Sequence, residues 1–263
     1  MAGETLDLRS AAEQLGVHYQ TAYKWVRSGV LASTLVRGRY HVSPEAVVAL
    51  ARRRDSPSRP RARRPRGGYE QARERMFIHL ISGEERKARD LISGLVDSGV
   101  TVTNATQEVL VPALRRIGQE WDAGRLSISA EHRAAAIVER ILGEHHPAPR
   151  GRRRGTAVVA AVAGDRHGLP TLMAAVALRE DNWRVHHLGA DVPPGELVDF
   201  CRGQSTDLAV ITVTSNSVSR RARHTAASLE DIGVRSIVGR PGASLAELVG
   251  DARVRSPRRS PVS

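Results

Sequence analysis

Hydrophobic positions in residues 1–55 recur three and four apart in two short stretches that are separated by a tight turn. The stretches "LRSAAEQLG" and "YQTAYKWVRSG" each carry one apolar face and end at a glycine, Gly16 and Gly29, as amphipathic helices do. "LVRGRYHV" then predicts a small β-hairpin, and Ser43 followed by Pro44 caps a third helix. This order predicts a winged helix-turn-helix domain that binds DNA, and a purely structural three-helix unit is the alternative.

The rest of the chain divides into a helical block and an alternating block. Residues 69–147 contain four stretches with apolar stripes and short connections, which predict a four-helix bundle. In residues 156–250, short apolar runs such as "TAVVAAVA" alternate with helical patterns. That alternation predicts a doubly wound parallel sheet of the Rossmann-like type. The predicted fold class is therefore mainly α plus α/β, in three domains.

Two Pro- and Arg-rich segments separate these blocks. Residues 56–68 lack apolar periodicity and are expected to form a basic linker, and "HHPAPRGRRRG" at 145–155 is similar. Cys201 is the only cysteine of the sequence, which excludes a disulfide framework. No apolar run has the length of a signal core or a membrane span. We therefore expect a soluble, cytoplasmic protein without a membrane partner.

The positive charge is concentrated in the first quarter of the chain. Residues 1–68 hold 13 Lys and Arg against 5 Asp and Glu, a surplus of 8 within the net charge of +12. Such a concentration indicates double-stranded DNA as a partner. The second helix of a helix-turn-helix enters the major groove, and the wing contacts the DNA backbone. The candidate DNA-binding residues are accordingly His18, Gln20, Thr21, Lys24 and Arg27 on the helix, and Arg37 and Arg39 on the wing.

An acid and a histidine, Asp165 and His167, follow the first strand of the expected sheet within "GDRHGLP". Ligands of open α/β sheets bind at the carboxyl ends of the strands. A carboxylate beside an imidazole fixes the tautomer of the ring and aims its other nitrogen at a proton or a metal. An aspartate at a strand-to-helix turn also serves as a helix N-cap, however. These seven residues alone leave both interpretations open.

The bundle and the sheet together resemble the cobalamin-binding module of methionine synthase, of corrinoid proteins and of the CarH/LitR-type photoreceptor repressors. The family motif reads Asp-x-His-x-x-Gly, later Ser-x-Leu, and then Gly-Gly. Asp165 and His167 match the first part of this motif. The segment from Thr212 to Thr214 lies where the family has Ser-x-Leu, and Gly239 is the first residue of the Gly-Gly position. The resemblance implies adenosylcobalamin as cofactor, His167 as the lower ligand of its cobalt, and Asp165 as the hydrogen-bond partner of that imidazole.

A second match lies in the bundle. Trp121, followed after nine intervening residues by Glu131-His132, reproduces the Trp…Glu-His signature of the photoreceptor cap. The resemblance implies that these three residues line the cavity of the 5′-deoxyadenosyl group. Taken singly, Trp121 also fits a place in the bundle core, and Glu131 and His132 fit a solvated helix start. With the N-terminal domain included, the resemblance covers nearly the whole chain.

Three positions depart from the family pattern. Pro170 replaces the glycine of the first motif and Arg240 replaces the second glycine of the pair, both where the family holds the nucleotide tail of the cofactor. Asp122 stands where photoreceptor members often carry a histidine, which becomes a cobalt ligand after light breaks the cobalt–carbon bond. A carboxylate offers no nitrogen ligand, so the illuminated state is expected to differ from that of the family.

The resemblance implies a transcriptional regulator, a repressor, whose operator binding is set by adenosylcobalamin and by light. Dimers or tetramers are expected, because one helix-turn-helix reads too short a site for high specificity. The alternative is a helix-turn-helix regulator that kept the fold but senses another ligand or none. An enzyme or corrinoid shuttle protein ranks third, because a shuttle needs no DNA-binding block and the chain has no room for a catalytic barrel.

Overall fold

The computed structural model describes residues 5–15, 17, 19–27, 31–36, 38–55, 68–145, 147 and 153–254. The chain forms two compact units, residues 1–61 and residues 62–263. Within the described residues, no helix combines the length and the apolar character that crossing a membrane requires.

The N-terminal unit is a small winged helix-turn-helix. Its elements are β1 (Leu6–Asp7), α1 (Leu8–Gln14), α2 (Tyr19–Arg27), β2 (Thr34–Val36), β3 (Arg39–Val42) and α3 (Pro44–Asp55). The strands form an antiparallel sheet in the order β1-β3-β2, in which the short strand β1 was not predicted. Asp7 begins α1 because its carboxylate accepts a hydrogen bond from the Ser10 N–H at 2.7 Å. The predicted helix ends, Gly16 and Gly29, lie outside the described residues.

Four helical segments form the bundle of the second unit. They are α4 (Glu70–Ser82), α5 (Glu85–Asp97), the continuous run of α6 (Val102–Ala105), η1 (Thr106–Leu110) and α7 (Val111–Asp122), and α8 (Ile128–Glu144). The third segment was predicted as one regular helix, but five of its residues form a π-helical turn. Thr106 begins this turn and is buried, and its hydroxyl has no hydrogen-bond partner in the described structure. The π turn therefore interrupts the regular α-helical hydrogen bonding of this segment at a buried polar side chain.

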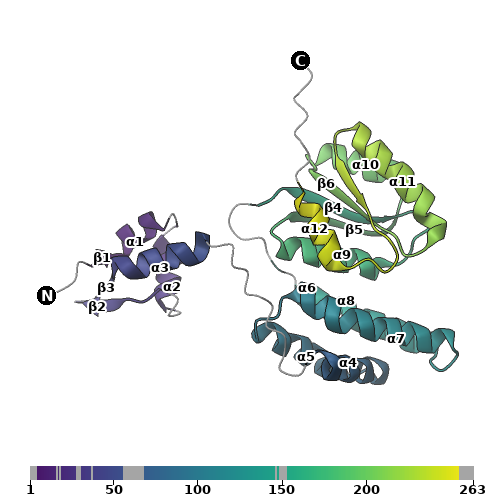
Figure 1. The fold of residues 1–263 in the computed structure, drawn as a ribbon, viewed down its shortest axis with the longest axis horizontal. Helices are drawn as coiled ribbons and strands as arrows, with labels where there is room; N and C mark the ends of the chain where they lie inside the picture. Colours follow the sequence, from purple (N-terminus) through teal and green to yellow (C-terminus); the bar gives the residue numbers. More distant parts are fainter. Residues whose placement is uncertain are drawn as a thin grey trace, which may run out of the picture. The chain divides into compact units, whose positions relative to one another are not determined.

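The sheet of the second unit contains β4 (Thr156–Val162), β5 (Arg184–Val192), β6 (Leu208–Thr212) and β7 (Arg235–Val238). All are parallel, in the order β5-β4-β6-β7. The helices α9 (Gly168–Glu180) and α12 (Leu245–Arg253) cover one face, and α10 (Pro194–Gly203) and α11 (Asn216–Asp231) cover the other (Figure 1). The predicted fold class, mainly α plus a doubly wound α/β sheet, is confirmed.

The bundle and the sheet are joined through α9. Met173 and Val176 of this helix are buried in the bundle core, and α8 runs beside α9 (Figure 1). At the far end of α9, the carboxylate of Glu180 accepts hydrogen bonds from the backbone N–H groups of Val102 and Thr103, both at 2.8 Å. These N–H groups belong to the first turn of α6, so a sheet-domain carboxylate caps a bundle helix.

We expect Glu180→Ala to lower the free energy of unfolding of the bundle–sheet unit by about 1–2 kcal/mol, because two N–H groups at a helix start lose their acceptor. Urea unfolding followed by circular dichroism measures the change. The exposed Asp231→Ala is the control and should differ from the unchanged chain by no more than about 0.5 kcal/mol. Equal effects of the two substitutions would contradict this role of Glu180.

Candidate functional site

A buried carboxylate organises the carboxyl-terminal edge of the sheet. Asp165 follows β4, is only 2% exposed, and accepts four hydrogen bonds. Its Oδ1 receives the His167 ring Nδ1 at 2.9 Å, the His167 N–H at 3.2 Å and the Thr214 hydroxyl at 2.8 Å. Its Oδ2 receives the Thr214 N–H at 2.9 Å. One side chain thus connects the loop after β4 to the loop after β6.

The ionisation of Asp165 decides the state of the neighbouring histidine. Burial opposes the charged form, but the hydrogen bonds from His167 and Thr214 outweigh it and hold the pKa of Asp165 below its ordinary value. An ionised carboxylate only accepts hydrogen bonds, so Nδ1 of His167 carries the proton toward it. In the neutral ring, Nε2 then keeps its lone pair, on a side chain that is 70% exposed. The arrangement presents an oriented imidazole nitrogen at the sheet edge.

The alternative role of Asp165, a helix N-cap, does not match the structure. The N-cap residue of α9 is His167, and its side chain makes no capping hydrogen bond. Pro170 lies in the first turn of the same helix, where proline needs no N–H. The carboxylate of Asp165 therefore accepts hydrogen bonds from His167 and Thr214 and does not cap α9.

Thr212 and Gly239 lie beside this cluster at the ends of β6 and β7. The hydroxyl of Thr212 is buried and has no hydrogen-bond partner in the described structure, a condition that costs about 1–3 kcal/mol unless a ligand or water satisfies it. Gly239 donates its N–H to the Ile211 carbonyl at 2.8 Å, and a Cβ there would lie 3.5 Å from the Thr212 Cα. That distance is an ordinary van der Waals contact, so the backbone of β6 does not by itself require a glycine at this position.

Two supporting groups were not predicted from the sequence. Asp191, near the end of β5, accepts the Gly164 N–H at 2.7 Å and donates its own N–H to the Asp165 carbonyl at 2.9 Å, which holds the loop of Asp165. The sequence offered the same indication for Asp191 as for Asp165, because both are acidic residues at the carboxyl end of a strand. His187 of β5 is the second group, and its Nε2 lies 2.7 Å from the hydroxyl of the buried Thr171, in the first turn of α9.

The predicted cap residues lie at the α7–α8 connection of the bundle. Trp121 is 45% exposed, so its alternative place in the bundle core does not match the structure. Glu131 and His132 contact each other, with 2.7 Å between Oε2 and Nδ1, in the first turns of α8. Further along this helix, Glu139 lies beside Gly168, the neighbour of His167. Glu131 is eight residues before Glu139, which is about 12 Å along the axis of α8. The predicted cap residues are therefore about two turns of α8 away from the start of α9.

The predicted DNA-binding residues lie mainly on α2. Gln20 and Arg27 are exposed, and Thr21 is half-buried. His18 and Arg37 lie outside the described residues, and the side chains of Lys24 and Arg39 are not described either; these four stay predictions. The exposed face of α2 also carries two tyrosines, Tyr19 and Tyr23, which were not among the predicted residues.

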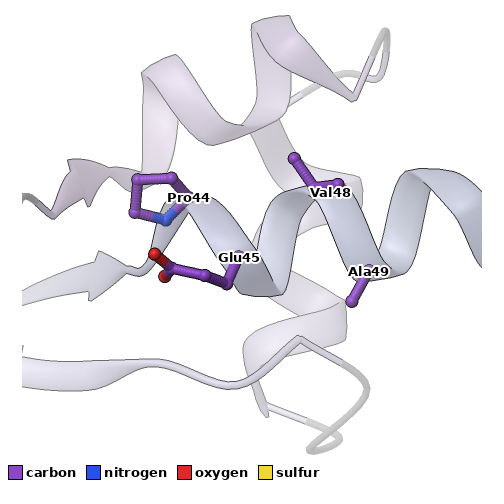
Figure 2. Close-up of a pocket in the computed structure, with 4 residues that line it drawn as sticks. All are labelled: Pro44, Glu45, Val48 and Ala49. Atoms are coloured by element: carbon purple, nitrogen blue, oxygen red, sulfur yellow. The ribbon is translucent and has the colours of Figure 1, made fainter.

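A shallow hollow lies on the outer side of α3, lined by Pro44, Glu45, Val48 and Ala49 (Figure 2). Val48 is half exposed there, and Glu45 brings a carboxylate to the rim. No predicted DNA-binding or cofactor-binding residue is among the four that line it. The hollow therefore shares no lining residue with either candidate site.

Comparison with known protein families finds two kinds of domain in this chain. A family described as "B12 binding domain" matches residues 72–144, which span the bundle from α4 to α8. A family described as "Helix-turn-helix domain" matches residues 5–55, the winged unit. The resemblance to CarH-type cobalamin-binding regulators is thereby confirmed for both domain types, in the expected order.

Particular relatives agree with this class. The chain is 31% identical over 126 residues to the HTH-type transcriptional repressor CarH of Myxococcus xanthus, which covers 48% of this chain and 42% of that protein. It is 29% identical over 171 residues to the HTH-type transcriptional repressor CarA of the same organism, over 62% of this chain and 54% of that one. The matched part of the chain thus spans about half the length of these curated relatives.

A solved structure shares the fold of the second unit. The monomethylamine corrinoid protein of Methanosarcina barkeri superposes with a TM-score of 0.57 over 70% of this chain and 98% of its own. The sequence identity is 13%, so the likeness concerns the fold alone.

The lowered pKa of Asp165 predicts how stability changes with pH. A carboxylate whose pKa is lower in the folded state stabilises the fold fully above its ordinary pKa, and the contribution is lost as the pH falls through the folded value. The difference in unfolding free energy between the chain and Asp165→Asn should therefore stay nearly constant from pH 7 to about 5 and shrink as the pH falls below about 4. Urea unfolding at several pH values measures it, and Thr214→Val, which removes one donor, should show a weaker dependence. A difference independent of pH would contradict the assignment.

Proposed function

We propose that this protein is a transcriptional repressor whose operator binding is controlled by adenosylcobalamin and by light. The observation that carries the proposal is the oriented imidazole of His167, held by the buried Asp165 at the ligand-binding edge of a sheet. The two domain types and the similarity to the CarH and CarA repressors support the DNA-binding part.

The described residues fit a cobalamin. An imidazole nitrogen is a suitable ligand for cobalt, and a ring held by a carboxylate loses little freedom on coordination. The unsatisfied Thr212 hydroxyl suits the polar tail of the cofactor. In this proposal His167 would bind the cobalt, Asp165 and Thr214 would hold its ring, and Thr212 and Gly239 would accommodate the tail.

The upper side of the cofactor is assigned to the bundle. Bound adenosylcobalamin supplies a light-sensitive cobalt–carbon bond and a bulky upper group. Trp121 offers a flat apolar wall to that group, and the carboxylate of Glu131, oriented by His132, offers an acceptor for its hydroxyl or amino groups. Asp122, which ends α7, provides no nitrogen ligand after illumination, so we expect the light state to be less stable than in relatives with a histidine there.

On DNA, the winged unit supplies the recognition surface. The exposed Gln20 and Arg27 on α2 face the duplex in this proposal, and the basic wing and linker bind phosphates. Assembly into dimers or tetramers would raise the affinity, because several winged units then engage one operator at once. In this proposal, the cofactor controls how many winged units bind one operator at the same time.

His167→Ala is expected to abolish stable retention of adenosylcobalamin, because it removes the proposed bond between protein and cobalt. Asp165→Asn should weaken binding by about ten- to a hundredfold, because it only disturbs the orientation of the ring. Absorption spectra after desalting in the dark measure retention, and His224→Ala, an exposed histidine of α11, is the matched control. A His167→Ala protein with an unshifted spectrum and unchanged affinity would leave a regulator that senses another ligand or none.

Light should alter both assembly and DNA binding of the cofactor-loaded chain. Size-exclusion chromatography and operator binding, each before and after green light, should show a smaller assembly and weaker binding after illumination. The cofactor-free chain, illuminated in the same way, is the control. Identical elution and affinity in both states would rule out the photoreceptor role and leave at most a ligand sensor.

A further inference from the structure

Three of the four tyrosines of the chain gather on one surface of the N-terminal unit. Tyr19 and Tyr23 lie on successive turns of α2 and are 46% and 40% exposed. Their rings are stacked, with centroids 6.4 Å apart and planes inclined by 23°. The ring of Tyr23 also meets Tyr40 of β3 edge to face, with centroids 5.9 Å apart. These rings form a continuous row from the start of α2 to the hairpin, which we call the tyrosine row.

The packing of the unit explains the place of Tyr40, which packs against the core, but not the exposure of Tyr19 and Tyr23. The core beneath α2 is made by residues such as Ala22, Leu31 and Val42, all almost fully buried. Tyr19 and Tyr23 leave much of their rings in solvent, and their hydroxyls make no hydrogen bond to any residue in the described part of the chain. Exposed tyrosines with an apolar ring and an unused hydroxyl are typical of interaction surfaces.

The surroundings of the row indicate the chemistry of the partner. Arg27 lies two turns after Tyr19 and one turn after Tyr23 on the same exposed face of α2. Leu35, which pairs with Tyr40 across the hairpin, is also exposed, at 60%. Cationic, aromatic and apolar side chains on one helix-and-wing surface suit the phosphates and sugars of a duplex.

We propose that the tyrosine row is a contact surface for the DNA backbone, an inference that rests on the DNA-binding function proposed above. The hydroxyls of Tyr19, Tyr23 and Tyr40 donate hydrogen bonds to phosphate oxygens, and their rings pack on the adjoining sugars. These contacts orient α2 in the groove and contribute affinity without reading bases. Because tyrosine is neutral, they release no counterions and leave the salt dependence of binding unchanged.

A neighbouring hollow sets one boundary of this surface. Tyr19 and Gln20 border a depression between α1 and α2 that is also lined by Arg9 and Glu13. Arg9 suits a phosphate there, but the carboxylate of Glu13 repels one. The backbone therefore follows the tyrosine row rather than entering the hollow.

Fluorescence anisotropy with the full-length chain and short labelled duplexes of mixed sequence tests the inference. The triple variant Tyr19→Phe/Tyr23→Phe/Tyr40→Phe keeps every ring and loses only the hydroxyls. It should bind all duplexes about tenfold or more weakly, because hydrogen bonds to charged phosphates are lost. Its slope of log Kd against log salt should equal that of the unchanged chain, whereas Arg27→Gln should reduce the slope by about one. Tyr69→Phe, the same change in the other unit, is the control and should bind normally.

The outcomes separate this inference from the function on which it rests. A triple variant with unchanged circular dichroism that binds duplexes within about twofold of the unchanged chain would overturn the inference alone. A triple variant that loses self-association but keeps its DNA affinity would overturn it too, and would assign the row to a second copy. A chain that binds no duplex at all contradicts the proposed function and this inference together.

Discussion

The hydrogen bonds to the buried carboxylate of Asp165 are the constraint on which the candidate cofactor site depends. They join the loop after β4 to the loop after β6 and fix the proton of the His167 ring on the inner nitrogen. Without the charge on Asp165, neither the tautomer nor the direction of the imidazole would be determined. Asp191 of β5 in turn holds the loop that carries Asp165, so three strands and their loops support one exposed nitrogen.

The second constraint is the attachment of the bundle to the sheet. α9 begins at the imidazole and ends at Glu180, so the same helix presents the proposed cobalt ligand and caps the bundle helix α6. Met173 and Val176 bury their side chains in the bundle between these two ends. α9 is thus held at both of its ends. A ligand that displaced the bundle near Trp121 would therefore have to strain the packing between the bundle and α9. That coupling suits a sensor, because an event at the cofactor is transmitted to the packing of a whole domain.

In the winged unit, the sequence pattern located the helices and the hairpin but not all of the exposed side chains on α2. The order of helices and hairpin led to α2 as the recognition helix, and charge led to Arg27 and its basic neighbours. The tyrosines of the same helix were not among the predicted residues. Only the folded unit separates the buried Ala22 from the exposed Tyr19 and Tyr23.

The sequence by itself determined the fold class, the order of the elements and the pairing of Asp165 with His167, because these depend on local periodicity and on residues close in the chain. It did not determine the place of Thr214 or Asp191 at the same carboxylate loop, or that Glu180 caps α6. These contacts join residues 26 to 78 positions apart, and only the parallel order of the strands and the docking of α9 bring them together. The π turn at Thr106 was not predicted either, because one extra residue shifts the apolar stripe by a single position, which is hard to see in a short segment.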